Sequence, residues 1–228
     1  FHPSRWQLTA KLTVVTTTFF FGFGAFFWGL FEWNNPATIG SYSSGDKILN
    51  AIFASVMMRS GGFNLVDMDT ITPVSTLLTD VLMFIGGGSG STAGGVKVTT
   101  IAVIALSILA EARGDQKVVA FNRTIPESSL RIAISVLVMS ATMVCIGAAT
   151  LVMISGADLK EVMFEVISAF GTCGLSSGLS SSLPPAGVYV LSLLMLIGRI
   201  GTTTAATGLA MRSRRRLYKF PEERPTIG

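Results

Sequence analysis

The sequence contains few charged residues and few of the side chains that usually perform catalysis or bind metals. Only 13% of its 228 residues are charged, about half the share of a typical soluble domain. Its one histidine is His2, and its two cysteines, Cys145 and Cys173, lack the spacing of metal ligands. These absences argue against a Ser–His catalytic pair, a metal centre and a disulfide framework. We therefore expect no enzyme and no bound cofactor in this chain.

The scarcity of charge leaves long apolar runs. Leu12–Phe31 and Ile132–Ala157 contain no charged residue, and the mean hydropathy of the chain is +0.61. A helix needs about 20 apolar residues to cross a bilayer, so both runs predict membrane-spanning helices. The net charge of +4 then indicates basic cytoplasmic loops rather than binding to nucleic acid.

The apolar segments occur in an order that repeats. Each series has a long run, a short run too brief to cross the bilayer, and a long run interrupted by one cation. The first series is Leu12–Phe31, Ile48–Met58, and Val81–Val96 with Val98–Ala110 around Lys97. The second series is Ile132–Ala157, Val162–Phe170, and Leu183–Gly198 with Ile200–Met211 around Arg199.

A single ungapped offset relates the two series. It places LMFIG at 82–86 on LMLIG at 194–198, Gly62 on Gly174 and Ser60 on Thr172. Internal repeats set architecture. We therefore predict an all-α membrane protein with two parallel helix–pore-loop–helix units. The units cover residues 1–114 and 115–220, and a tail covers 221–228.

Basic residues predict the orientation. They concentrate near both ends and in the central loop: Arg5, Lys11, Arg113, Lys117, Arg123, Arg131, Arg212, Arg214, Arg215, Arg216, Lys219 and Arg224. The opposite side carries only Lys47, Arg59 and Lys160. Because Lys and Arg collect on the cytoplasmic side, both ends of the chain are expected in the cytoplasm of a multi-pass cell-membrane protein.

Each short run is followed by a glycine-containing segment. These two segments are Ser60, Gly61, Gly62, Phe63 and Asn64, and Thr172, Cys173, Gly174, Leu175 and Ser176. A half-spanning helix followed by irregular backbone is the arrangement of an ion selectivity filter, in which carbonyl oxygens replace the hydration shell of an ion. The alternative is that both are ordinary extracellular loops.

A run of small residues interrupts the first broken helix. It consists of Gly86, Gly87, Gly88, Ser89, Gly90, Ser91, Thr92, Ala93, Gly94 and Gly95. Such residues allow a loop to lie in a narrow, water-filled pore and to move. A phosphate-binding loop is disfavoured, because Val96 separates Gly95 from Lys97 and no Ser or Thr follows the lysine.

Several acidic residues are expected near the outer side. Glu32, Asp46 and Asp158 either attract cations to the outer mouth or cap helices, and capping is favoured for Asp46 and Asp158. Asp80 either bonds to a neighbouring helix or faces the cytoplasmic vestibule. Glu165 is expected to anchor the second short helix by hydrogen bonds.

The motifs resemble those of a known family. RSGGFNLVDMD, LMFIGGGSGSTAGGVKVTT, SAFGTCGLSSGLS, LMLIGRIGTTTAATGLA and YKFPEE are similar, in order and along nearly the whole chain, to the membrane subunits of the Trk/Ktr/HKT superfamily of potassium transporters. The resemblance implies four helix–pore–helix units, of which this chain holds the third and fourth, as the C-terminal half of a longer protein.

The resemblance also implies roles for individual residues. Gly62 and Gly174 match filter glycines that favour K⁺ over Na⁺, and the loop 86–95 matches an intramembrane gate below the filter. Arg199 matches an arginine below the filter, and we expect it to bond to loop carbonyls; the alternative is an arginine that snorkels at a helix end. Lys97 is expected at the foot of the gate or, alternatively, at the cytoplasmic interface.

The resemblance further implies an assembly. It implies a homodimer and a cytosolic ring of regulatory subunits that bind nucleotide, with docking on the basic segments 113–131 and 212–219. Those segments suit anionic lipid equally well. The family usually has Thr-Ala-Gly where this chain has Ser60-Gly61-Gly62. A Na⁺-permeable cation transporter is therefore kept as an alternative. A non-conducting membrane scaffold or receptor built on the same repeat is the other alternative.

Overall fold

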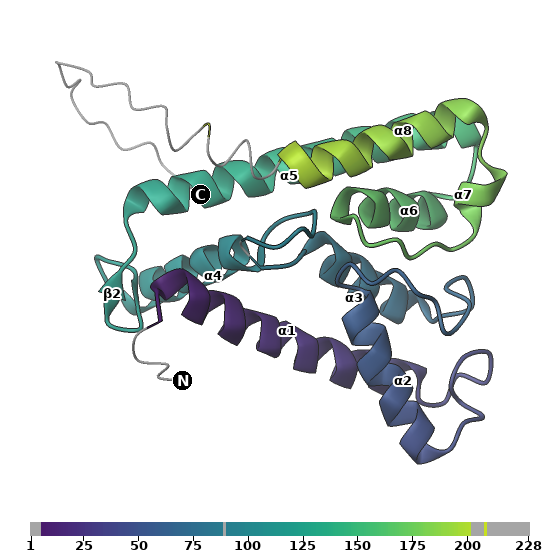
Figure 1. Ribbon diagram of the computed structural model, residues 1–228, viewed down its shortest axis with the longest axis horizontal. Helices are drawn as coiled ribbons and strands as arrows, with labels where there is room; N and C mark the ends of the chain where they lie inside the picture. The colour runs from purple at the N-terminus through teal and green to yellow at the C-terminus, as the bar shows by residue number, and fades with distance from the viewer. Residues whose placement is uncertain (1–5, 89, 202–207, 209–228) are drawn as a thin grey trace.

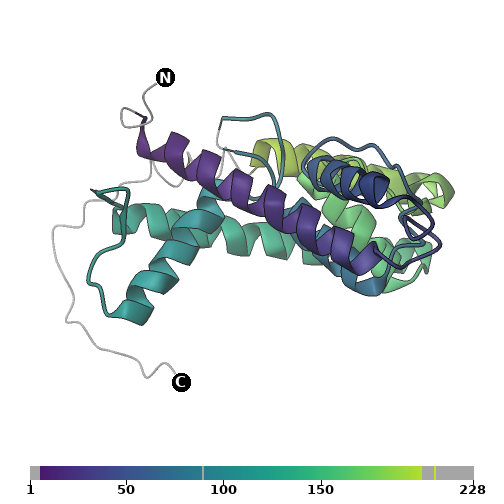
Figure 2. The same ribbon diagram turned by 90° about the horizontal axis from the view of Figure 1, so that it is seen from below.

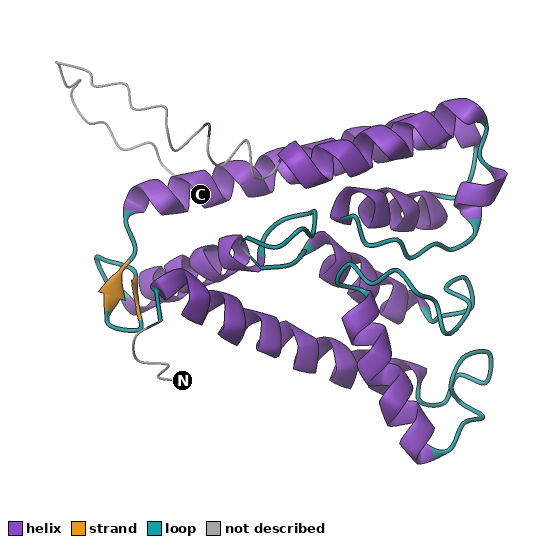
Figure 3. Cartoon of the chain, in the orientation of Figure 1, coloured by secondary structure: helices purple, strands orange, loops and turns teal. Residues whose placement is uncertain are grey.

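The structure is a computed structural model that describes residues 6–88, 90–201 and 208, and it is mainly helical (Figures 1 and 3). Its helices are α1 (Leu8–Glu32), α2 (Ser44–Met57), α3 (Pro73–Phe84), α4 (Val98–Arg113), α5 (Glu127–Ser155), α6 (Leu159–Gly171), α7 (Leu179–Ser182) and α8 (Pro185–Leu196). A π-helical segment, Ile197–Gly201, continues α8. Strands β1 (Val119–Ala120) and β2 (Arg123–Thr124) form an antiparallel hairpin that the all-α prediction did not include.

Two of the described helices, α1 and α5, are long and apolar enough to cross a membrane by length and composition. α1 contains the whole uncharged run from which it was predicted. α5 begins before its run, at Glu127, and ends at Ser155, because Gly156 takes a left-handed conformation that closes the helix. The helices α3 and α8 are shorter apolar helices.

Helix α3 begins at Pro73, eight residues before the uncharged run that starts at Val81. The Thr72 side chain accepts from Ser75 N–H and caps the first turn, and Pro73 occupies a position where no backbone donor is needed. The helix therefore includes a polar first turn that a search for apolar runs does not detect.

The short helices α2 and α6 coincide with the two predicted short runs, but their caps differ from the prediction. Ser43, not Asp46, caps α2: the backbone N–H of Asp46 donates to Ser43 Oγ at 3.3 Å, and Ser43 Oγ donates back to the Asp46 carboxylate at 2.7 Å. Asp158 does occupy the N-cap position of α6, but its side chain makes no capping hydrogen bond. The cap of α2 was thus predicted too late in the chain.

Helix α6 lies at the centre of the packing. It contacts α3 on one side and α5 and α8 on the other, and most of its residues are buried. Figures 1 and 2 show α2 and α6 near the end of the molecule opposite the β-hairpin. The main apolar core, which includes Trp28, Leu82 and Phe170, joins α1, α3 and α6. The segments that follow α2 and α6 are therefore held by the same core.

Glu32 ties the end of α1 to the beginning of α3. Its side chain is fully buried and accepts hydrogen bonds from Asn35 Nδ2 at 2.7 Å, Thr38 Oγ1 at 2.7 Å, and both Thr72 N and Thr72 Oγ1 at 2.8 Å. A buried carboxylate requires such compensation for lost hydration. These hydrogen bonds give Glu32 a structural role at this junction, and its predicted role of attracting cations to the outer mouth stays a prediction.

The second broken helix differs from the prediction. α8 ends at Leu196, but helical structure continues past Arg199, because the π-helical segment runs directly on from α8 through Gly201. Single π turns are rare and often occur at functional positions. The predicted piece after Arg199 and the predicted tail 221–228 lie almost entirely outside the described residues.

Candidate ion pathway

The first glycine segment follows α2 and has an unusual backbone. Ser60 has φ 89° and Gly62 has φ 70°, so both lie in the left-handed region that L-residues avoid. The next two residues, Phe63 and Asn64, are exposed, Phe63 to 70%. Left-handed residues at every second position give the carbonyl groups directions that a regular helix or strand does not allow. Such a backbone can turn several carbonyl oxygens towards one path, as in a filter lined by carbonyls.

The second glycine segment follows α6 and repeats this backbone. Thr172 has φ 49° and Gly174 has φ 95°. Cys173 and Leu175 are buried. Ser168 of α6 holds the segment from behind, since its hydroxyl donates to Leu175 O at 2.6 Å and accepts from Gly174 N–H at 3.2 Å.

The two segments lie against each other in register. Ser60 Oγ donates to Thr172 O at 3.0 Å, and Asn64 Nδ2 donates to Ser176 O at 2.9 Å. Both bonds join residues 112 apart, which is the offset of the sequence repeat. A Cβ atom at Gly62 would lie 2.7 Å from Cys173 O. The contact therefore requires glycine, for its conformation and for its lack of a side chain.

Glu165 and Cys173 complete the anchoring of the second segment. The Glu165 carboxylate accepts from the hydroxyl of Ser176 and from Ser177 N–H at 3.0 Å. The Cys173 thiol donates to Met57 O at 3.1 Å, which links the segment to α2. Glu165 anchors by hydrogen bonds, as expected, and its partners belong to the glycine segment and to the residue after it.

Arg59 lies beside the first segment, and the sequence indicated it only as an outer charge. Its guanidinium carbon is 5.5 Å from the centroid of the Phe20 ring. Both of its terminal nitrogens are buried with no hydrogen-bond partner among the described residues. The face of the Phe20 ring is an electrostatic partner for its positive charge.

Asp80, on α3, also has a buried polar atom without a hydrogen-bond partner among the described residues, which is one of its carboxylate oxygens. The structure therefore does not choose between the two expectations for Asp80.

The loop between α3 and α4 is folded back on itself (Figure 1). Its two ends pair, since Gly86 N–H donates to Val96 O at 2.8 Å and Val96 N–H donates to Phe84 O at 3.1 Å. Within the described part of the loop, Ser91 Oγ donates to Gly88 O at 2.7 Å. Ser89 lies outside the described residues. The loop therefore forms a closed, hydrogen-bonded projection from the interrupted helix.

The C-terminal part of the loop contacts the base of the second segment. Gly94 N–H donates to Thr172 Oγ1 at 2.8 Å. A Cβ atom at Gly95 would lie 3.4 Å from Gly171 Cα. The predicted loop and the predicted filter segment are thus brought together by a direct hydrogen bond.

Lys97 bonds to the loop. Its ammonium group donates to Ala93 O and to Ser91 O, the latter at 3.4 Å. The sequence-based prediction gave this contact to Arg199, which has no hydrogen bond to a loop carbonyl among the described residues. Lys97 and Arg199 nevertheless lie near enough for their positive charges to repel each other.

Arg199 lines a cavity of about 560 Å³ next to the second segment. Thr172, Gly174 and Ser168 line the same cavity, together with residues of α8. An arginine in an apolar segment usually faces a cavity or a partner. The cavity therefore favours a pore-facing Arg199 over an arginine that reaches out to the membrane surface.

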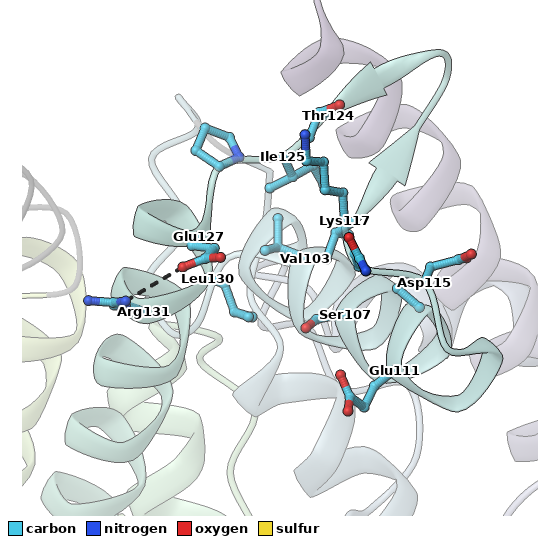
Figure 4. Close-up of a pocket in the computed structure, with 14 residues that line it drawn as sticks. Val103, Ser107, Glu111, Asp115, Lys117, Thr124, Ile125, Glu127, Leu130 and Arg131 are labelled. Carbon is cyan, nitrogen blue, oxygen red and sulfur yellow. Dashed lines mark ion pairs between the residues drawn. The ribbon is translucent and has the colours of Figure 1, made fainter. Parts of the chain in front are cut away.

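A second pocket, of about 430 Å³, lies at the hairpin end between α4 and the start of α5 (Figure 4). Its lining combines apolar residues with charges of both signs: Glu111, Asp115, Lys117, Glu127 and Arg131. Glu127 and Arg131 form an exposed ion pair at 3.5 Å. The predicted basic surface is therefore mixed in charge in its described part.

The described residues contain no group of three or more His, Cys, Asp or Glu side chains that could hold a metal ion.

Comparison with known proteins identifies the family. The family model of TrkH, described as a cation transport protein, matches residues 1–215. The chain belongs to the TrkH cation transport family. Its fold is similar to the crystal structure of the potassium transporter TrkH from Vibrio parahaemolyticus, with a TM-score of 0.70 and 19% identity over 87% of this chain and 44% of that one.

Curated members of the family are more similar in sequence. The Ktr system potassium uptake protein B of Vibrio alginolyticus is 37% identical, covering 97% of this chain and 49% of the relative. The protein of the same name from Bacillus subtilis is 39% identical, covering 77% and 39%. The potassium/sodium uptake protein NtpJ of Enterococcus hirae is 35% identical, covering 90% and 47%. The chain spans about half the length of the first and third of these relatives and less of the second.

Some features of the site were not predicted from the sequence. The filter segments were assigned to backbone carbonyls alone, and the side chains of Ser60, Asn64 and Thr172 were missed as bonding groups. The offset of the repeat already paired Ser60 with Thr172 and Asn64 with Ser176. A check of which aligned positions carry a donor would have found both cross-segment bonds.

Proposed function

We propose that this TrkH-family chain forms part of a potassium uptake pathway across the cell membrane. The observation that carries the proposal is the pair of glycine segments in register, joined by the Ser60–Thr172 and Asn64–Ser176 hydrogen bonds. K⁺ replaces its hydration shell with the carbonyl oxygens of these segments. The chain supplies the third and fourth helix–pore–helix units of a four-unit pore, and it performs no enzymatic reaction.

The loop 86–95 acts as the gate of this pathway. Its bond to Thr172 lies at the base of a filter segment, and its small residues allow it to move. Lys97 holds the loop through carbonyls, and Arg199 adds positive charge beside the cavity. A closed loop flanked by two cations opposes the passage of K⁺ both sterically and electrostatically.

A Na⁺-permeable transporter is the second candidate. It is favoured by Ser60-Gly61-Gly62, which lacks the usual family threonine and alanine, and by the name of the Enterococcus relative, a potassium/sodium uptake protein. An additional glycine gives the backbone more freedom and weakens discrimination between ions of different size.

The assembly is proposed from the family. The membrane subunit forms a homodimer, and a cytosolic ring of nucleotide-binding regulatory subunits docks on the side of the β-hairpin. The pocket beside the hairpin carries charges of both signs. Such a surface suits a folded protein partner better than a uniformly anionic lipid surface.

Flux measurement tests the function. Uptake of radioactive Rb⁺, as a K⁺ substitute, and of Na⁺ is measured in liposomes that contain a full-length protein including this chain. Wild type is compared with a variant lacking residues 87–94 and with Arg199→Ala. Faster Rb⁺ uptake in both variants, with Na⁺ excluded, is the expected result.

Other outcomes of this experiment discriminate between the alternatives. Equal Rb⁺ and Na⁺ uptake in the wild type would support the Na⁺-permeable transporter. Unchanged Rb⁺ uptake in both variants would show that the interrupted helix is only a packing feature. Absence of uptake of either ion by correctly folded protein would favour the membrane scaffold.

A further inference from the structure

Thr172 is the residue at which three parts of the pathway meet. Its hydroxyl oxygen accepts from Gly94 N–H of the loop at 2.8 Å. Its carbonyl oxygen accepts from Ser60 Oγ of the other filter segment at 3.0 Å. Its backbone N–H donates to Ala169 O at the end of α6. One residue therefore bonds to the loop, to the facing segment and to its own helix.

The backbone of Thr172 is strained to achieve this. Its φ of 49° and ψ of 39° lie in the left-handed region, which is unfavourable for a β-branched residue. Such a conformation persists only where the surrounding contacts determine it, and it often marks a functional position. Here it coincides with a side chain that contacts the loop rather than its own helix.

The loop is shaped to accept this contact. A Cβ atom at Gly94 would lie 2.7 Å from Thr172 Cγ2, 2.8 Å from Thr172 Oγ1 and 3.0 Å from Phe170 O. Only glycine at this position lets the loop backbone reach the hydroxyl. The Gly94–Thr172 bond thus depends on matched features of two segments that are far apart in the sequence.

We propose that the Thr172 hydroxyl is the latch that holds the gating loop closed against the filter, so that opening of the loop breaks the Gly94–Thr172 bond. This proposal rests on the proposed function of the site. Thr172 acts as a positioning residue for the gate. The Ser60 bond holds its carbonyl separately, so release of the hydroxyl changes the gate and leaves the filter backbone in place.

The latch has a specific consequence for ion passage. Thr172 lines the 560 Å³ cavity that also contains Arg199. Loss of the hydroxyl removes the bond that holds the loop beside this cavity and therefore favours the open loop, but it does not alter the carbonyl path that selects the ion.

The test compares Thr172→Val, which has nearly the same shape but no hydrogen-bonding oxygen, with Thr172→Ser, which keeps the oxygen. Thr142→Val is the matched control, because Thr142 on α5 is exposed and its hydroxyl bonds to its own helix. Rb⁺ and Na⁺ uptake is measured with full-length protein in liposomes. Loss of one hydrogen bond that holds the loop is expected to raise Rb⁺ uptake by Thr172→Val about fivefold. The Rb⁺ to Na⁺ ratio is expected to stay unchanged. Thr172→Ser, which restores the oxygen, is expected to raise Rb⁺ uptake less than Thr172→Val, and Thr142→Val is expected to match wild type.

A second readout reports the loop directly. Thr92, which is exposed on the loop, is replaced by cysteine in a Cys145→Ala background, and its rate of modification by a thiol reagent is measured. We expect Thr172→Val to speed modification more than Thr172→Ser does. If Thr172→Val does not fold, Thr172→Ala serves as the variant without a hydroxyl.

The loop deletion decides whether Thr172 acts through the loop. In the variant lacking residues 87–94, Thr172→Val is expected to add nothing to Rb⁺ uptake, because Gly94 is absent. An additional increase there, or wild-type uptake and labelling in Thr172→Val, would overturn the latch. If no variant transports Rb⁺, the proposed function fails, and the labelling of Thr92→Cys still decides whether the latch exists.

Discussion

At the scale of single residues, Gly62 shows how closely the two segments depend on a missing side chain. Its φ of 70° is left-handed, and a Cβ atom would lie 2.7 Å from Cys173 O and 3.2 Å from Gly174 Cα. Neither neighbour is a flexible side chain that can move aside. Any other residue at this position must therefore separate the segments.

Gly62→Ala tests this contact. The left-handed conformation alone costs an alanine about 1 kcal/mol or more, and the clash with backbone adds to that cost. We expect Rb⁺ uptake by the full-length protein to fall to the level of protein-free liposomes, or to lose its preference over Na⁺. The control is Gly22→Ala on α1, where a Cβ atom meets nothing within 4 Å. Normal, selective uptake in Gly62→Ala would argue against a filter at this position.

The sequence indicated some of the site residues and not others. Gly62, Gly174 and the loop glycines stood out in the sequence because glycine in an apolar run needs a backbone explanation. Ser60, Asn64 and Thr172 did not stand out, because serine, asparagine and threonine are common in loops. Their partners are distant in the sequence, and only the folded chain brings donor and acceptor within 3.0 Å.

At the scale of elements, the described helices follow the apolar runs, while their ends follow caps. The runs located α1, α2, α5 and α6, since apolar length is visible in the sequence. The uncharged run from Val81 did not reveal where α3 starts, because the first turn of the helix, capped by Thr72, contains polar residues. The π-helical turn at Arg199 leaves no pattern in composition.

Glu32 gives a prediction for the junction of α1 and α3. Removal of its carboxylate leaves the donors of Asn35, Thr38 and Thr72 without their acceptor in a buried place. We expect Glu32→Ala to lower the free energy of unfolding by about 2–4 kcal/mol. Denaturation of the purified full-length protein in mixed micelles measures this.

A conservative variant and a surface control accompany Glu32→Ala. Glu32→Gln keeps one oxygen acceptor and is expected to lose less stability than Glu32→Ala. Glu111→Ala is the control, because this glutamate is exposed near the end of α4, and surface substitutions usually stay within about 0.5 kcal/mol. Equal stability of Glu32→Ala and wild type would mean that Glu32 serves the ion path rather than the fold.

At the scale of the whole molecule, the two ends of the structure differ in character. The end that carries α2 and α6 presents the glycine segments, and the end that carries the β-hairpin presents the mixed-charge pocket (Figures 1 and 4). The distribution of basic residues predicts that the hairpin end faces the cytoplasm. This orientation remains a prediction.

Cysteine labelling tests the orientation. In a Cys145→Ala background, Lys160→Cys places a thiol at an exposed position on α6, and Lys117→Cys places one at an exposed position beside the β-hairpin. These two positions belong to opposite ends of the folded structure. A membrane-impermeant reagent is expected to label Lys160→Cys in intact cells, and Lys117→Cys only after the cells are permeabilised. Cys173 is buried and serves as the internal control in the parent. The reverse labelling pattern would invert the orientation.

The sequence by itself determined the set of segments: two long apolar helices, two short helices, an interrupted helix and an internal repeat. These follow from hydropathy, glycine content and self-similarity, which are properties of the chain read in order. Only the tertiary structure decided which side chains meet: Lys97 rather than Arg199 on the loop carbonyls, Glu32 within a shell of donors, and Thr172 between the loop and the filter. The physical reason is that hydrogen bonds depend on distances of about 3 Å between groups far apart in sequence, and packing around α6 sets those distances.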